Sequence, residues 1–120
     1  MNPQKFTKKS IEAINEAQSA AIDFQNMNVE QEHLLYALTA QENGLIPQLI
    51  TRMGADTEQV TNYLSKLIGE IPKVTGSGRE ANTVYISQDV DKCLNKAEET
   101  AKNMRDDFVS VEHIMLALFD

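Results

Sequence analysis

The sequence has no tryptophan, one cysteine and few aromatic residues, which make up 6 % of its 120 positions. A single cysteine cannot form an internal disulfide. This is typical of a reducing compartment, so we expect a cytoplasmic protein. No apolar run approaches the length of a membrane span, and residues 1–5 lack the apolar segment of a signal peptide.

Clustered positive charge is missing as well. The sequence has 11 basic and 18 acidic residues, which gives a formal net charge of −7. Nucleic acids and anionic membranes are bound by clustered lysine and arginine, so we expect neither partner. The phosphate-binding sequence Gly-x-x-x-x-Gly-Lys-Ser/Thr and the hydrolase sequence Gly-x-Ser-x-Gly are also absent. We therefore expect a chain that is no enzyme on its own and holds no cofactor or metal.

The most informative feature that is present is an internal repeat. Residues 29–38 and 109–118 both read Val-x-x-Glu-His, two aliphatic residues, any residue, then Ala-Leu. The match continues upstream at the same offset without a gap and pairs Thr7 with Ser87. A gapless match of this kind indicates duplication of one structural unit.

Apolar residues at spacings of three and four predict helices throughout, and hence an all-α fold of two repeats related by a pseudo-twofold axis. Thr7, Ser87 and Ser110 are suitable N-caps, and Gly54 is a suitable helix end. The predicted helices cover about 8–25, 30–39, 45–53, 57–69, 88–104 and 111–119.

The chain reads as one domain, residues 1–120, in three parts. Repeat one covers 6–70, an exposed linker covers 71–84, and repeat two covers 85–120. Pro72, Gly76 and Gly78 punctuate the linker. Repeat two stops where counterparts of the helices in 45–70 would begin. We expect a fragment of a longer protein, and the alternative is a naturally asymmetric domain.

The two Glu-His pairs suggest a metal or acid–base site, but their spacing argues against it. Adjacent helical residues point in different directions, and zinc requires three or four converging ligands. We instead expect Glu32 and Glu112 to cap the first helical turn. We expect His33 and His113 to pack on the partner helix with one ring nitrogen hydrogen-bonded. Cys93 is expected to be a small buried or half-buried side chain without nucleophilic character.

These features resemble a known family. Phe6-Thr7 opening a helix, the duplicated motif and Gly44-Leu45-Ile46 before a short helix resemble the Clp N-terminal repeat domain. This all-helical module precedes the ATPase modules of Clp-type AAA+ chaperones. The linker start at 71–76 and the segment 85–87 are most similar to the ClpB type, the bacterial disaggregases.

The resemblance implies the partners and the cofactors. ATP and magnesium would act only in ATPase modules further along the polypeptide. The full-length protein would assemble into a hexamer, whereas the isolated domain is expected to be monomeric. The domain would engage unfolded or aggregated polypeptides weakly, in a groove between the repeats, during protein disaggregation in the stress response. Adaptor proteins are further candidate partners.

The resemblance also implies site residues. The functional positions of the family match Thr7, Asp106 and Glu112, and an apolar groove position matches Leu94, with Ile114 as a neighbour. On the sequence alone, Leu94 is equally a core residue, and Thr7 and Glu112 are equally helix caps. Arg105 stands where the family often has glycine before the loop aspartate, which leaves the geometry of this loop open.

Three other functions remain open at this stage. An adaptor-docking domain of a ClpC- or ClpA-type unfoldase predicts tight binding of one folded partner. A small hydrolase or metalloenzyme on a helical bundle predicts turnover or bound metal. A structural spacer predicts no binding at all.

Overall fold

The computed structural model describes residues 2–74 and 83–119. A short 3-10 helix, η1 (Pro3–Lys5), and two two-residue strands, β1 (Asn28–Val29) and β2 (Tyr85–Ile86), accompany six α-helices. The helices are α1 (Lys8–Asp23), α2 (Gln31–Ala40), α3 (Leu45–Arg52), α4 (Thr57–Gly69), α5 (Gln88–Asn103) and α6 (Val111–Leu118). The all-α class is confirmed, and each helix was predicted to within two residues at its ends. Residues 75–82 of the predicted linker lie outside the described residues.

The helices begin and end where the sequence provides suitable side chains. The Thr7 hydroxyl accepts from the backbone N–H of Ser10 at 3.2 Å, and the Ser87 hydroxyl accepts from that of Val90 at 3.1 Å. Both bonds satisfy donors that the first helical turn leaves unpaired. Gly54 adopts a φ of 83° just after α3, a left-handed conformation that glycine tolerates well.

The two repeats pair with each other through exchanged extended segments. Val29 pairs with Ile86 in the parallel β1–β2 ladder, and Phe6 pairs with Val109 in a parallel bridge. Val29 of repeat one corresponds to Val109 of repeat two, and Phe6 corresponds to Ile86. The two pairs are therefore symmetry equivalents of each other. This exchange is what a twofold axis between the repeats requires, and the predicted pseudo-symmetry is confirmed.

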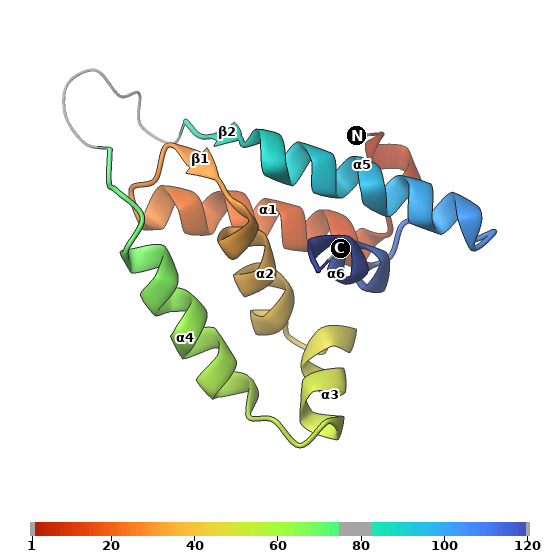
Figure 1. The fold of residues 1–120 in the computed structure, drawn as a ribbon, viewed down its shortest axis with the longest axis horizontal. Helices are drawn as coiled ribbons and strands as arrows, with labels where there is room; N and C mark the ends of the chain where they lie inside the picture. The colour runs from red at the N-terminus through yellow and green to blue at the C-terminus, as the bar shows by residue number, and fades with distance from the viewer. Residues whose placement is uncertain (1, 75–82, 120) are drawn as a thin grey trace.

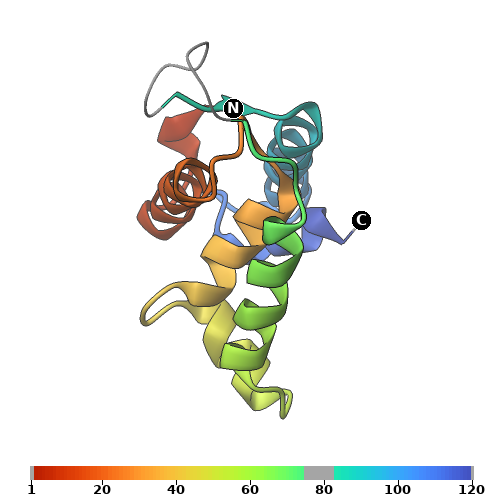
Figure 2. The ribbon, with the colours of Figure 1, turned by 90° about the vertical axis from the view of Figure 1, so that its left-hand side faces the viewer.

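The centre of the molecule is formed by α2 and α6, with α1 and α5 flanking them on opposite sides (Figures 1 and 2). Alanines line the flanking helices where they meet the centre, and Ala13, Ala17 and Ala97 are fully buried. Such small side chains allow the helices to pack closely. The larger core side chains of the central helices include Leu34, Leu38 and Ile114.

The remaining two helices project away from α1 and α5, with α4 packed along α2 (Figures 1 and 2). Ile46 of α3 and Ile68 of α4 are buried. No corresponding pair follows α6 in the described part of the chain. On α6 and just beyond it, Leu116 and Phe119 are 56 % and 70 % exposed.

Phe6 is the only aromatic side chain buried in the core among the described residues, and it lies in the seam between the repeats. Phe6→Ala should lower the free energy of unfolding by about 3–5 kcal/mol, because it leaves a cavity beside Val109. Urea denaturation followed by circular dichroism measures this change. The control Phe119→Ala should change the free energy by less than about 0.5 kcal/mol. Equal effects of the two substitutions would contradict the assigned role of Phe6.

Candidate functional site

The turns that follow α1 and α5 have the same backbone conformation. Gln25 and Arg105 both adopt left-handed φ values, 60° and 59°. After α5, the N–H of Asp106 donates to the Ala101 carbonyl at 2.9 Å and the N–H of Arg105 donates to the Lys102 carbonyl at 3.0 Å. These two bonds define a Schellman motif. Arg105 therefore adopts a left-handed conformation that glycine tolerates best, at a cost of about 1–2 kcal/mol.

A histidine fastens each of these turns to the following helix. His33 Nε2 lies 2.8 Å from Asn26 Oδ1, and His113 Nε2 lies 2.8 Å from Asp106 Oδ2. The other ring nitrogen, Nδ1, accepts from the N–H of the helix N-cap at 2.9 Å in both repeats. An Nδ1 that accepts from an N–H carries no proton, so Nε2 carries it and donates to the turn.

This arrangement corrects two predictions made from the sequence. We expected one bonded ring nitrogen on each histidine, and the structure has two. We also expected Glu32 and Glu112 to cap the first helical turn. Both lie in first helical turns, but in the described residues the histidines accept the N-cap N–H. The partners Asn26 and Asp106 lie seven residues before their histidines. This spacing alone does not predict a contact from the sequence.

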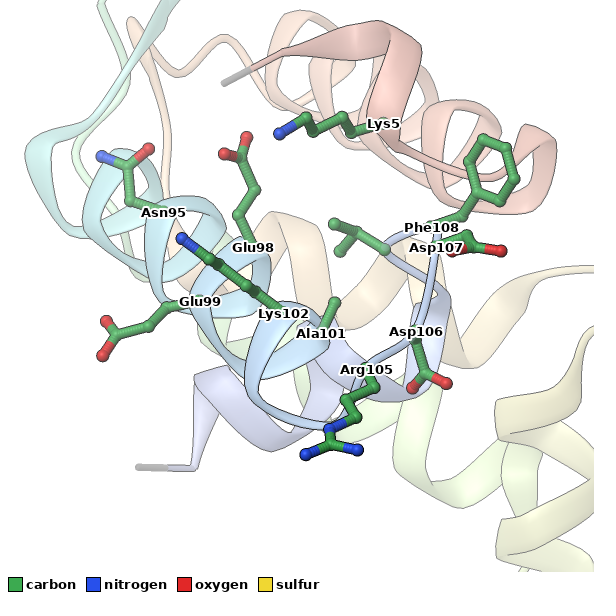
Figure 3. Close-up of a pocket in the computed structure, with 11 residues that line it drawn as sticks. Lys5, Asn95, Glu98, Glu99, Ala101, Lys102, Arg105, Asp106, Asp107 and Phe108 are labelled. Atoms are coloured by element: carbon green, nitrogen blue, oxygen red, sulfur yellow. The ribbon is translucent and has the colours of Figure 1, made fainter.

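The residues Asp106, Asp107 and Phe108, called here the Asp106–Phe108 turn, separate two hollows. The larger has a volume of about 780 Å³ and lies between Lys5 and α5 (Figure 3). Lys5 and Glu98 extend toward each other across it, whereas Arg105 points away from it (Figure 3). This hollow lies at the seam, since Lys5 belongs to the segment that leads into repeat one.

The smaller hollow has a volume of about 330 Å³ and lies at the start of α6. It is lined by Met104, Asp106, Asp107, Phe108, Ser110, Glu112 and His113. Three carboxylates and no lysine or arginine are present among these residues. Met104 and Phe108 are each 55 % exposed, which leaves apolar surface beside the carboxylates. This small hollow is therefore acidic and partly apolar.

The predicted site residues fall into two groups. Asp106 and Glu112 line the same small hollow. Thr7 is held near them, because its N–H donates to the Val109 carbonyl at 3.0 Å. Leu94 and Ile114 are 2 % and 0 % exposed and belong to the core. The structure thus does not place these two on an accessible groove.

Met104 and Phe108 were not predicted as site residues from the sequence. The available signal was two large apolar residues flanking a charged break, Met104-Arg105-Asp106-Asp107-Phe108. The predicted helix extended to residue 104, but α5 ends at Asn103 and leaves Met104 on the surface.

Cys93 lies in the core, as expected. Burial raises the pKa of its thiol to about 11, so the reactive thiolate is scarce at neutral pH. In the described part of the chain, no group of three or more His, Cys, Asp or Glu side chains is arranged to hold a metal ion. No helix among the described residues is long and apolar enough to cross a membrane.

The sequence and fold define the class of this protein. Residues 5–120 match the sequence model of the Clp repeat (R) N-terminal domain, so the chain belongs to this family. The chain is 39 % identical over 120 residues to the chaperone protein ClpB of Nitratidesulfovibrio vulgaris. It is 37 % identical over 117 residues to ClpB of Bacillus anthracis. The matches cover 100 % and 98 % of this chain but only 14 % of each relative.

Solved structures agree on the fold. The N-terminal domain of Hsp104 from Candida albicans superposes with a TM-score of 0.82 at 22 % identity, covering 97 % of this chain and 74 % of that one. The N-terminal domain of the caseinolytic protease associated chaperone ClpD from Arabidopsis thaliana gives 0.76 at 22 % identity, covering 99 % and 78 %. The chain is therefore similar to the N-terminal domains of ClpB- and Hsp104-type chaperones.

His33 makes the stability of the domain depend on pH. Its burial lowers the pKa of the imidazole below the ordinary 6.5, and the Glu32 carboxylate partly offsets this shift. The stability that neutral His33 contributes is complete above pH 6.5, the value for the unfolded chain. It is lost as the pH falls from 6.5 through the lowered folded-state pKa. The free energy of unfolding from urea denaturation should therefore decrease as the pH is lowered from 8 to 5.

His33→Gln is the matched control, since glutamine at this position can accept the N-cap N–H but does not titrate. We expect a flatter dependence on pH for this variant than for the wild type. Identical slopes between pH 6.5 and 5 would show that His33 is not the titrating group.

Proposed function

We propose that this domain binds exposed hydrophobic segments of unfolded or aggregated polypeptides, as the substrate-engaging N-terminal domain of an ATP-dependent ClpB-type chaperone. The observation that carries the proposal is the pair of exposed side chains Met104 and Phe108, which lie just before and within the Asp106–Phe108 turn between the two hollows. Similarity to ClpB chaperones over nearly the whole chain supports it.

Binding at this surface should be weak and rapid. One or two apolar anchors contribute about 1.5–3 kcal/mol each when fully buried. A dissociation constant of about 1 mM corresponds to about 4 kcal/mol, so affinities of roughly tens of micromolar to millimolar follow. In a hexameric full-length chaperone, several such domains would raise the effective concentration of binding sites. Weak binding would also allow substrates to pass on to the ATPase modules.

The remaining features of the proposal concern the whole protein. ATP and magnesium would act in ATPase modules outside this chain, and the domain itself would require no cofactor. The isolated domain would be a monomer, and the protein would act in the cytoplasm.

A second candidate function is the docking of folded adaptor proteins, as in a ClpC- or ClpA-type unfoldase. An apolar stripe along α3 favours it. Leu45, Leu49 and Met53 recur at every fourth residue and are 38 %, 40 % and 79 % exposed. A rigid helical stripe of this kind suits a folded partner better than a flexible chain.

A methyl NMR titration distinguishes the two candidates. The probe is a permanently unfolded protein, reduced and carboxymethylated α-lactalbumin. We expect fast-exchange shifts of the Met104 methyl group, and Met104→Ala should weaken binding about fivefold, or about 1 kcal/mol. The control Met53→Ala removes an equally large exposed side chain and should leave the affinity unchanged. Shifts confined to Met53 and the α3 stripe, or no shifts at millimolar probe, would refute the proposed site.

A further inference from the structure

The loop between α2 and α3 contains the only asparagine of the sequence that is followed by glycine, Asn43-Gly44. Asparagine is a thermolabile residue, because the backbone nitrogen that follows it can attack its side-chain amide. Glycine favours this attack, since it has no Cβ to hinder the approach. Asn43 is exposed, and both helices that flank the loop lie within the described residues. Sequence and exposure therefore favour the reaction at Asn43.

The backbone around Asn43 is also held loosely. Asn43 has a left-handed φ of 55°, which asparagine tolerates better than most residues. The Gly44 N–H donates to the Gln41 carbonyl at 3.3 Å, which is longer than the usual distance of about 2.9–3.0 Å. Regular hydrogen bonds instead fix the backbone around the asparagines in the interior of α1, α4 and α5, which are Asn15, Asn62 and Asn95. Attack on the side-chain amide requires the backbone to rotate, so the loop permits what the helices resist.

Packing makes glycine necessary at position 44. A Cβ there would lie 3.0 Å from both Cβ and Oε1 of Gln41. Gln41 is 7 % exposed, and its Nε2 donates to the Lys9 carbonyl at 2.9 Å, which holds the side chain in place. A larger residue at position 44 would therefore disturb the contact between this loop and α1. The fold thus requires the residue that makes Asn43 reactive.

We propose that Asn43 is a site of spontaneous deamidation, which yields aspartate and isoaspartate and changes the start of α3. The Gly44 nitrogen forms a bond to Asn43 Cγ, and the side-chain nitrogen leaves as ammonia with the proton of the Gly44 N–H. Water then opens the resulting five-membered succinimide. Cleavage of the bond from nitrogen to Cγ gives aspartate, and cleavage of the bond from nitrogen to the main-chain carbonyl carbon gives isoaspartate. Water is the only other reactant.

Isoaspartate displaces α3, because it adds one carbon to the main chain between α2 and α3. Before this point the loop is fixed to α1, since Lys9 Nζ donates to the Glu42 carbonyl at 3.1 Å. After it, α3 begins at Leu45 and carries Ile46, which is 2 % exposed in the core. The additional length lies between these two attachments, so α3 must shift relative to α1.

The test is prolonged incubation of the purified domain at mildly alkaline pH, followed by peptide mapping with mass spectrometry. Isoaspartate is measured by methyl transfer from S-adenosylmethionine with protein isoaspartyl methyltransferase. We expect deamidation to accumulate at Asn43 and to be slow at Asn15, Asn62 and Asn95. The isoaspartate signal should come mainly from the peptide that contains position 43.

Asn43→Gly should lose most of the isoaspartate signal, since glycine retains the left-handed conformation and has no side-chain amide. Asn62→Gln is the matched control, because it replaces an exposed asparagine of α4 without a change of charge. It should keep the signal of the wild type. Equal loss of signal in the two variants would overturn the assignment to Asn43.

Methyl NMR spectra of the incubated domain test the effect on α3. The methyl signals of Ile46 and Leu49 should shift or split in proportion to the isoaspartate formed, whereas those of Leu94 in α5 should not. Asn43→Gly, incubated in parallel, should show no such change. Unchanged α3 signals in the deamidated domain would overturn the proposed displacement of α3.

Two further results would overturn the site itself. Deamidation spread evenly over the asparagines would show that the Asn43-Gly44 loop is not favoured. Intact Asn43 in the folded domain, under conditions in which a peptide of residues 41–47 deamidates, would show that the fold protects this residue.

Discussion

The structure depends on an exchange of backbone hydrogen bonds between its two repeats. The Val109 carbonyl accepts from the Thr7 N–H and from the Ser10 hydroxyl, and the Val29 carbonyl accepts from the Ser87 N–H. Each pair of helices is therefore preceded by a segment whose partner belongs to the other repeat. A buried polar group left unpaired costs about 1–3 kcal/mol, so neither repeat completes its hydrogen bonding alone. The two repeats should unfold together.

The same exchange positions the candidate site. The Asp106–Phe108 turn lies between two fixed points, the pairing of Val109 with the segment before α1 and the hydrogen bond from His113. Its counterpart in repeat one is fixed in the same way, by the pairing of Val29 with the segment before α5 and by the hydrogen bond from His33. The change from Asn26 to Asp106 gives the turn after α5 its negative charge.

Much of the fold follows from local sequence signals. Helix positions were predictable because apolar spacing and the caps at Thr7 and Ser87 act within one or two turns of chain. The candidate site was only partly predictable. Periodicity shows that Leu94 faces an apolar environment but does not distinguish a core from a groove, and the structure buries it. The contact between His113 and Asp106 depends on how the turn folds back, and Arg105 adopts a conformation that its side chain does not favour.

Native-state hydrogen exchange tests the central claim, that the exchanged pairing joins both repeats into one cooperative unit. The amides to follow are those of Thr7, Ser87 and Val109, each hydrogen-bonded across the seam. The account predicts that all three exchange only through global unfolding, with one common free energy that equals the value from urea denaturation. Exchange of Ser87 or Val109 at a much lower free energy, while the helices of repeat one stay protected, would show that the repeats open independently and would contradict it.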